Sequence, residues 1–263
     1  MVRLKSFAPF GLKGRTRFRA VYDVAGRTAQ GKREHMEDFV RVVQPFGGSD
    51  GLYAAVFDGH GGEDVSRRGS DRLHEILAAL WESEPAVDAL ASAFKAFDGE
   101  VADEKAGSVA TVSVLQGEWL SVANVGDCHA LVVSESAQEI VTQGHRLTNQ
   151  EEYDRVVAAG AKIRAPYMCL PGGRGLMTTR SFGDAAFKQI GNIAEPAIAT
   201  RAMGPGDRWI VLGSDGVWDF LAAEDVAAIV RPASSATVAA DQLLDAVLPV
   251  SDDNVSVIIV RLG

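Results

Sequence analysis

Cysteine and histidine are scarce in this chain. The two cysteines, Cys128 and Cys169, have neither a Cys-x-x-Cys partner nor the spacing of a metal site. The five histidines are scattered, without the clustering of a zinc site. Neither cysteine lies in a Cys-x5-Arg phosphate loop. We therefore expect reduced thiols in a cytoplasmic protein, and chemistry that uses neither zinc nor a cysteine nucleophile.

Basic residues are outnumbered by acidic ones. The formal net charge is −9, which argues against a nucleic-acid-binding protein because such proteins normally present a basic face. The exception is the N-terminus, where Met1 to Arg19 carries six basic residues and no acid. It has no continuous apolar stretch and is therefore not a secretory signal. We expect residues 1–20 to form a basic lead-in; a docking arm or an organelle-targeting peptide is the alternative.

Long apolar runs are also lacking. The nearest candidate for a membrane span is Ala106 to Gly126, whose only charged residue is Glu118. The turn-forming Gln116-Gly117-Glu118 interrupts it, and both halves are β-branched and contain Ser, Thr or Asn. The pattern favours two strands of a buried hairpin. We therefore expect no membrane span.

The chain has no internal repeat, low-complexity run or obvious linker, so we expect one domain over residues 21–263. Its pattern predicts strands near 21–27, 37–43, 52–57, 108–115, 119–125, 129–134, 209–213 and 254–261. It predicts helices near 63–81, 85–103, 149–159, 223–230 and 235–247. Short connections between strands favour antiparallel pairing. The predicted fold class is α+β, a four-layer α-β-β-α sandwich of two mainly antiparallel sheets with helices on both outer faces.

Acidic residues recur at the ends of the predicted strands. The run Leu52 to Phe57 ends at Asp58-Gly59-His60, and its glycines should stop the strand there. Three other segments have a similar layout, namely Glu37-Asp38, Ser214-Asp215-Gly216 and Asp252-Asp253-Asn254. Several acids held at strand ends by tight turns are typical of a site that binds a hard cation through oxygen. Such ligands suit Mg²⁺ or Mn²⁺.

Seven motifs in order resemble the metal-dependent serine/threonine protein phosphatases of the protein phosphatase 2C family. They cover roughly residues 21–261: Arg33…Met36-Glu37-Asp38, Phe57-Asp58-Gly59-His60-Gly61-Gly62, Gly107-Ser108-Val109-Ala110, Ala123-Asn124-Val125-Gly126-Asp127, Thr179-Arg180-Ser181-Phe182-Gly183-Asp184 before Glu195-Pro196, Ser214-Asp215-Gly216-Val217-Trp218-Asp219, and Asp253-Asn254-Val255-Ser256-Val257. Any one of these motifs is modest evidence, whereas seven in order are strong evidence.

The resemblance implies hydrolysis of phosphoserine and phosphothreonine in proteins by a water activated between two metal ions. Asp58 would bridge the two ions. Glu37 and the Gly59 carbonyl would serve one ion, and Asp215 and Asp253 the other.

Three further residues take roles from the same resemblance. Arg33 would bind the phosphate, since a guanidinium matches its oxygens in a bidentate way. His60 would be the general acid that protonates the leaving oxygen, or would hydrogen-bond to a metal-bound water. Asp38 would assist catalysis by orienting Glu37 or through water.

One departure from the family pattern concerns a third metal ion. The family usually has Asp-His-x-Pro where this chain has Gly144-His145-Arg146-Leu147, and the resemblance implies that the acid missing at Gly144 helps to hold a third ion. Asp219 could contribute to such a site together with Asp215, so we expect a weak third site. Asp127 is expected to be a turn residue.

The Gly-rich segment near 160–195, which includes Tyr167 and Arg174, is predicted to form a mobile flap near the site.

Two other functions remain open at this stage. One is a non-catalytic module of the same fold that binds a partner or pseudosubstrate; the other is a phosphatase acting on small phosphoesters. Against the first, every two-metal position and Arg33 are intact. We expect a phosphoprotein substrate, no nucleic-acid partner and a monomer.

Overall fold

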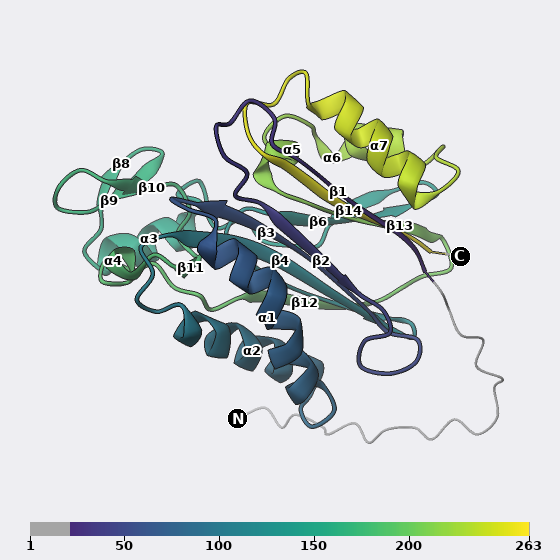
Figure 1. Cartoon of the computed structure of the whole chain (residues 1–263), viewed down its shortest axis with the longest axis horizontal. Helices are drawn as coiled ribbons and strands as arrows, with labels where there is room; N and C mark the ends of the chain where they lie inside the picture. Colours follow the sequence, from purple (N-terminus) through teal and green to yellow (C-terminus); the bar gives the residue numbers. More distant parts are fainter. Residues whose placement is uncertain (1–21, 263) are drawn as a thin grey trace.

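Two antiparallel sheets packed face to face form the centre of the computed structural model, which describes residues 22–262 (Figure 1). The predicted basic lead-in therefore lies outside the described residues. The first sheet has the order β1-β14-β13-β6-β7, formed by Asp23–Ala29, Val255–Arg261, Asp207–Gly213, His129–Ser134 and Gln138–Ile140. The second has the order β12-β5-β4-β3-β2, formed by Ala197–Ala202, Trp119–Val125, Gly107–Gln116, Leu52–His60 and Phe39–Val43; β11 (Phe182–Gly183) also pairs with β4.

Helices cover the outer face of each sheet. Helices α1 (Asp64–Trp81) and α2 (Ala86–Glu100) pack on the second sheet through an apolar cluster that includes Leu73, Leu90 and Phe94. Helices α6 (Ala223–Val230) and α7 (Ala236–Val247) pack on the first sheet. A further apolar layer fills the space between the sheets. The four-layer α-β-β-α prediction is confirmed (Figure 1).

The alternation of side chains along β3 determines where the functional residues lie. Tyr53, Ala55 and Phe57 belong to the cluster under α1 and α2, whereas Leu52 and Val56 belong to the layer between the sheets. Successive side chains of a strand point to opposite faces. Asp58 and His60 therefore continue the face of Val56, toward the other sheet.

Most predicted elements are present, but β3 is longer than expected. It continues through Asp58 and Gly59 to His60, whose partner on β4 is Gly107. The prediction that the glycines stop the strand at Phe57 is therefore wrong, because β4 supplies backbone partners for these residues. The sequence pattern also did not predict β7, β11, α4 (Ala185–Lys188) and α5 (Asp215–Trp218), which span too few residues to show a period, nor the six-residue strand β12.

A small third sheet occupies part of the predicted flap. Its strands are β8 (Lys162–Arg164), β9 (Tyr167–Cys169) and β10 (Gly175–Leu176), and it follows α3 (Gln150–Ala158). It has its own apolar cluster, which includes Val156 and Phe187. In Figure 1 this sheet lies at one end of the sandwich, beside α3 and α4. Its mobility stays a prediction.

The membrane and hairpin predictions concern the same segment. Residues 107–125 form the β4–β5 hairpin, as expected. Across residues 22–262, no helix combines the length and the apolar character that a membrane crossing requires.

Candidate active site

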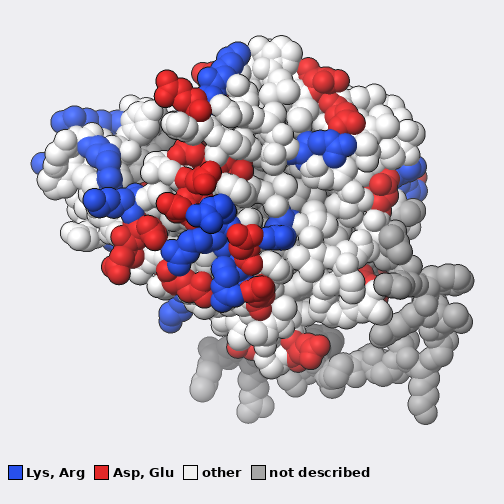
Figure 2. All heavy atoms as spheres, in the orientation of Figure 1, with Lys and Arg blue, Asp and Glu red and all other residues white. Residues whose placement is uncertain are grey.

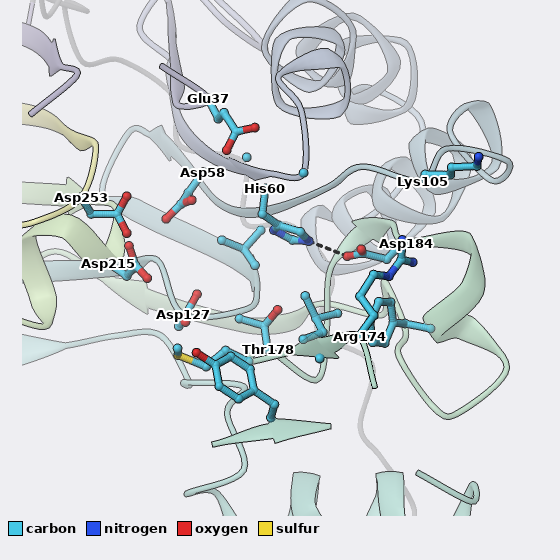
Figure 3. Close-up of a pocket in the computed structure, with 18 of the residues that line it drawn as sticks. Glu37, Asp58, His60, Lys105, Asp127, Arg174, Thr178, Asp184, Asp215 and Asp253 are labelled. Carbon is cyan, nitrogen blue, oxygen red and sulfur yellow. Dashed lines mark hydrogen bonds and ion pairs between the residues drawn. The ribbon is translucent and has the colours of Figure 1, made fainter. Parts of the chain in front are cut away.

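One pocket at the end of the sandwich gathers most of the predicted site residues. Its lining includes Arg33, Glu37, Asp58, Gly59, His60, Asp215 and Asp253 from the prediction, together with Asp127. Figure 3 shows one group of carboxylates at one end of the pocket, with Asp184, Lys105 and Arg174 toward the other end; the group comprises Glu37, Asp58, Asp127, Asp215 and Asp253. Asp38 and Asp219 are not part of this lining. The predicted flap contributes Tyr167 and Arg174 to the lining of the same pocket.

Asn254 joins the loops that carry Glu37 and Asp253. Its side-chain Oδ1 accepts from the Glu37 backbone N–H at 2.8 Å, and its Nδ2 donates to the His35 carbonyl at 2.9 Å. Glu37 is further fixed through Oε1, which accepts from the Gly62 N–H at 2.6 Å. The segment before β2 is thereby held against the start of β14, so residues more than two hundred positions apart share one site.

Gly59 and Gly216 are both required by packing. A Cβ on Gly59 would lie 2.4 Å from the Glu37 carbonyl oxygen, and a Cβ on Gly216 would lie 1.9 Å from the Asn254 carbonyl oxygen. Both glycines therefore let backbone segments that carry acids approach one another. Close packing explains Gly59 without a metal ion, so the role of its carbonyl as a ligand stays a prediction.

The acids of the site are crowded and repel one another: Asp127 is buried, whereas Glu37, Asp58, Asp215 and Asp253 are half-buried. Burial, followed by the charges of Asp215 and Asp38, raises the pKa of Asp58 well above its usual value. Burial and the charge of Asp127 raise the pKa of Asp215 to about 7. Such a group of carboxylates favours either protonation or a bound cation. Among the residues that the structure describes, no three of these side chains converge closely enough to ligate one ion as they stand.

Asp38 lies behind the pocket rather than in it. Its side chain is buried, and its Oδ2 atom has no hydrogen-bond partner among the described residues. Burial raises its pKa to about 7, although the nearby hydroxyls of Ser256 and Ser214 oppose this. This position agrees with a role in supporting its neighbours and not with direct contact to a substrate.

Arg33 faces the site but is engaged with an acid. Its Nη2 donates to Oδ2 of Asp253 at 2.5 Å, and its Nε lies 3.3 Å from the Asp252 carbonyl oxygen. The side chain is 55% exposed, so it remains accessible from solvent. Arg33 therefore lies next to a predicted metal ligand and lines the pocket.

His60 is paired with an acid that sequence analysis left without a role. Its Nε2 lies 2.6 Å from Oδ2 of Asp184, which also accepts from the Ser181 hydroxyl at 2.6 Å (Figure 3). Although burial lowers the pKa of His60, the hydrogen bond and charge of Asp184 raise it above its usual value overall. Asp184 adopts φ 52°, an uncommon backbone for a residue other than glycine. The sequence feature that points to a role for Asp184 is its position at the end of the motif Thr179 to Asp184.

The third-ion residues are arranged differently from the expectation. Asp127, and not residue 144, lies beside Asp215 and Asp219, and all three contact Arg146. A Cβ on Gly144 would instead lie 3.4 Å from the ring of His129. Gly-Asp dipeptides usually serve as turns, which is why the sequence predicts only a turn residue at Asp127. Tertiary packing makes Asp127 a member of the acidic group.

Comparisons with known proteins agree with this architecture. Residues 22–255 match the family described as Protein phosphatase 2C. The chain is 31% identical over 248 residues to probable protein phosphatase 2C 59 of Oryza sativa subsp. japonica, covering 89% of this chain and 74% of that protein. It is 30% identical over 244 residues to probable protein phosphatase 2C 59 of Arabidopsis thaliana, covering 89% and 78%.

Solved structures share the fold. A crystal structure of serine-threonine phosphatase 2C from Toxoplasma gondii superposes with a TM-score of 0.83 at 21% identity, covering 92% of this chain and 95% of that chain. A C. elegans sex determining protein gives a TM-score of 0.78 at 25% identity, covering 92% of this chain and 65% of that one. At 21% identity the first likeness shows the fold alone.

Proposed function

Because this chain belongs to the protein phosphatase 2C family of serine/threonine protein phosphatases, we propose that it hydrolyses phosphoserine and phosphothreonine with two divalent ions, Mn²⁺ or Mg²⁺. The ligands would be Glu37, Asp58, Gly59, Asp215 and Asp253. The observation that carries this proposal is the group of half-buried carboxylates that line one pocket, where the pKa of Asp58 is raised well above its usual value.

The donor set fits hard divalent cations. Every proposed ligand offers oxygen, which suits Mg²⁺ and Mn²⁺ and disfavours softer metals. The buried and unpartnered Oδ2 of Asp38 supports the same assignment, because a carboxylate behind the ligands is suited to orienting them. When bound, such ions supply Lewis acidity and activate water for attack on phosphorus.

Side chains of the protein would bind the phosphate and donate the proton to the leaving group. Arg33 would break its ion pair with Asp253, or keep it while Asp253 also binds an ion. Its exposed guanidinium would then bind the phosphate oxygens. His60, held by Asp184 with a raised pKa, would donate a proton to the leaving seryl or threonyl oxygen. Lys105 and Arg174 lie toward the other end of the pocket, where the rest of a protein substrate would extend (Figure 3).

The surface bears on the partner prediction. On the face shown in Figure 2, blue and red side chains are interspersed, and no broad region of one sign stands out. Together with the net charge of −9, this supports a phosphoprotein substrate over nucleic acid. We retain a single catalytic domain over residues 21–263, a monomeric state and a cytoplasmic location as parts of the proposal.

Asp58→Asn tests the proposed metal chemistry. We expect the wild type to hydrolyse p-nitrophenyl phosphate and a phosphothreonine peptide with Mn²⁺, and to lose activity with chelator. The variant should lose at least about a hundredfold in kcat, because it lacks the shared anionic ligand. Phosphometabolites serve as a comparison set. Turnover that persists in chelator, or unchanged turnover in Asp58→Asn, would contradict the proposal; faster turnover of phosphometabolites would indicate small phosphoesters as substrates.

A further inference from the structure

Arg146 lies where three carboxylates meet. Its Nε donates to Oδ2 of Asp127 at 2.5 Å, and its Nη1 donates to Oδ1 of Asp219 at 2.8 Å. Its Nη2 lies 3.0 Å from Oδ2 of Asp219 and 3.2 Å from Oδ2 of Asp215. Each nitrogen of the guanidinium therefore contacts an acid, and Asp219 is bound in the bidentate way that this planar group favours.

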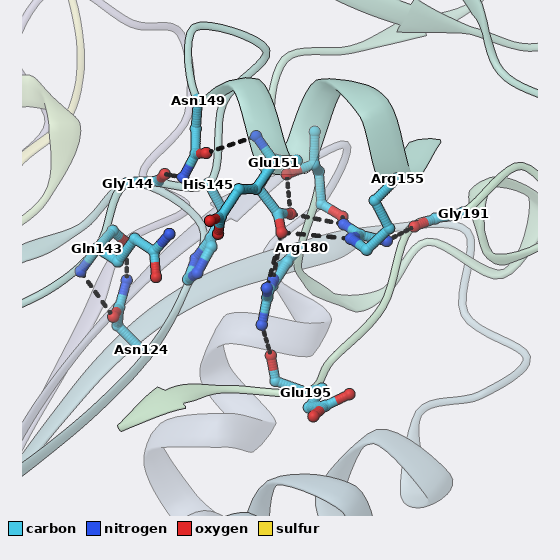
Figure 4. Close-up of polar contacts among 12 residues, drawn as sticks. Asn124, Gln143, Gly144, His145, Asn149, Glu151, Arg155, Arg180, Gly191 and Glu195 are labelled. Atoms are coloured by element: carbon cyan, nitrogen blue, oxygen red, sulfur yellow. Dashed lines mark hydrogen bonds and ion pairs between the residues drawn. The ribbon is translucent and has the colours of Figure 1, made fainter. Parts of the chain in front are cut away.

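The backbone on either side of Arg146 fixes this position. The N–H of His145 donates to the Gly126 carbonyl at 3.0 Å, and the His145 carbonyl accepts from the Thr179 N–H at 2.9 Å. In Figure 4 the preceding residues Gln143 and Gly144 are tied to neighbouring side chains by further hydrogen bonds. The segment is therefore held beside the β5–β6 turn, so the side chain of Arg146 reaches Asp127 without depending on a bound ligand.

Arg146 approaches the acids from behind the pocket. Asp127 and Asp215 line the pocket, whereas neither Arg146 nor Asp219 does. The side chain of Arg146 is 24% exposed, against 55% for Arg33 at the pocket rim. A substrate phosphate in the pocket would meet Arg33, while the donors of Arg146 are already committed to carboxylates. A role in binding substrate therefore does not explain Arg146.

We propose that Arg146 is a built-in cation that takes the place of a third divalent ion among Asp127, Asp215 and Asp219. This inference rests on the proposed two-ion centre. A hard cation at this position would need the same carboxylate oxygens that now accept from the guanidinium. The fixed guanidinium neutralises the outer acids and holds Asp215 toward the pocket. It therefore limits the chain to two ions.

The test counts bound Mn²⁺ in wild type and in Arg146→Met, which removes the charge and keeps an apolar stem. Apoprotein is titrated with Mn²⁺ to millimolar concentration, and free ion is measured by electron paramagnetic resonance. We expect Arg146→Met to bind one ion more than wild type. The double variant Arg146→Met with Asp219→Asn should return to the wild-type number, because the extra ion needs Asp219.

Arg201→Met is the matched control. Arg201 also contacts two carboxylates, Glu139 and Asp207, but neither of these lines the pocket. This variant should bind as many ions as wild type. Arg146→Lys, which keeps the charge, should also bind the wild-type number. An unchanged count in Arg146→Met would overturn the proposal, as would an extra ion in Arg146→Lys.

A second measurement applies if Arg146→Met folds only with metal. Asp219→Asn in the otherwise wild-type chain should leave the ion count unchanged, because the guanidinium and not an ion uses Asp219. Loss of one ion in Asp219→Asn would overturn the proposal. Failure of the proposed function can be told apart from failure of this inference. A wild type that binds no Mn²⁺ contradicts the two-ion centre. The role of Arg146 is tested by the difference in the number of bound ions between Arg146→Met and wild type.

Discussion

At the residue scale, Gly107 shows the most direct link between sequence and chemistry. It pairs with His60 across β3 and β4. A Cβ on Gly107 would lie 2.1 Å from Oδ2 of Asp184 and 2.3 Å from Nε2 of His60. Only glycine leaves room for the imidazole and the carboxylate to meet above the strand. The glycine of this motif therefore serves the proposed general acid.

Gly107→Ala is expected to separate His60 from Asp184. The value of kcat should fall by about a hundredfold, at the low end of the range for loss of general acid catalysis. Asp184 raises the pKa of His60, and the proposed acid works only when protonated. Separation should therefore move the alkaline limb of the kcat profile to lower pH. Steady-state kinetics on a phosphothreonine peptide from pH 6 to 9 measures both effects.

Gly99→Ala provides the control for this substitution. Gly99 lies in α2, and a Cβ there would meet no atom within 4 Å. Alanine should leave kcat unchanged and stabilise the protein by about 0.5 kcal/mol, because it favours the helix. A Gly107→Ala enzyme with wild-type kcat and an unmoved alkaline limb would show that the His60–Asp184 pair is not needed for proton transfer.

At the element scale, α3 is tied to the segment that carries Asp184. Glu152 of α3 is buried and accepts from Arg155, Arg180 and the hydroxyl of Thr179. The two arginines extend the network to the carbonyls of Gly191 and Glu195 (Figure 4). The helix is thereby anchored to residues 179–195, so the network supports the wall of the pocket opposite the carboxylates.

Glu152→Gln is expected to destabilise the fold by about 2–3 kcal/mol, because two arginines lose a buried counter-charge. Burial raises the pKa of Glu152, but Arg180, Arg155 and Thr179 lower it well below its ordinary value of 4.5 overall. A lowered carboxyl pKa stabilises the folded state above the unfolded-state pKa, and this stabilisation is lost as pH falls through the folded-state pKa. Denaturant unfolding should therefore show the full difference at pH 7 and a smaller one below about pH 4.

Glu151→Gln is the neighbouring control. Glu151 is exposed on the same helix, so its substitution should change stability by less than about 0.5 kcal/mol. If Glu152→Gln is equally mild, or if its effect is the same at pH 7 and at pH 3.5, then the network contributes little to the stability of the fold.

At the scale of the whole molecule, the two sheets bring like charges together at one end of the sandwich. The pKa values of Asp38 and Asp215 are raised to about 7, mainly by burial, and the pKa of Asp58 is also raised well above its usual value. A raised carboxyl pKa means that the folded state binds more protons than the unfolded state between the two values. Stability therefore falls as pH rises through this range.

We expect the metal-free protein to be less stable at pH 8 than at pH 6, by about 1 kcal/mol for each of Asp38 and Asp215. Mn²⁺ should stabilise the protein most at pH 8, where its ligands are ionised; saturation at a hundredfold over Kd contributes about 2.7 kcal/mol. Thermal unfolding in chelator and in Mn²⁺ at both pH values measures this. Asp38→Asn should weaken the pH dependence in chelator. A metal-free protein that gains stability from pH 6 to pH 8 would contradict the prediction.

The sequence by itself determined the fold class and most of the candidate site. Long strands and helices carry their own periodicity, so the layers followed from local pattern. Asp58, Asp215 and Asp253 were recognisable because a glycine or an asparagine follows each of them, and Glu37 because it lies beside the apolar run Phe39 to Val43. These are properties of short segments, and a linear sequence displays them.

Only the tertiary structure decided which side chains meet. The pairing of His60 with Asp184 joins residues 124 positions apart, and Arg146 reaches Asp215 across 69. No local signal connects such residues, because strand register and sheet packing bring them together. For the same reason β3 continues to His60, where pairing with β4 overrides the turn tendency of its glycines. The local sequence indicates which residue types are functional, and the packing of the two sheets determines which residues they contact.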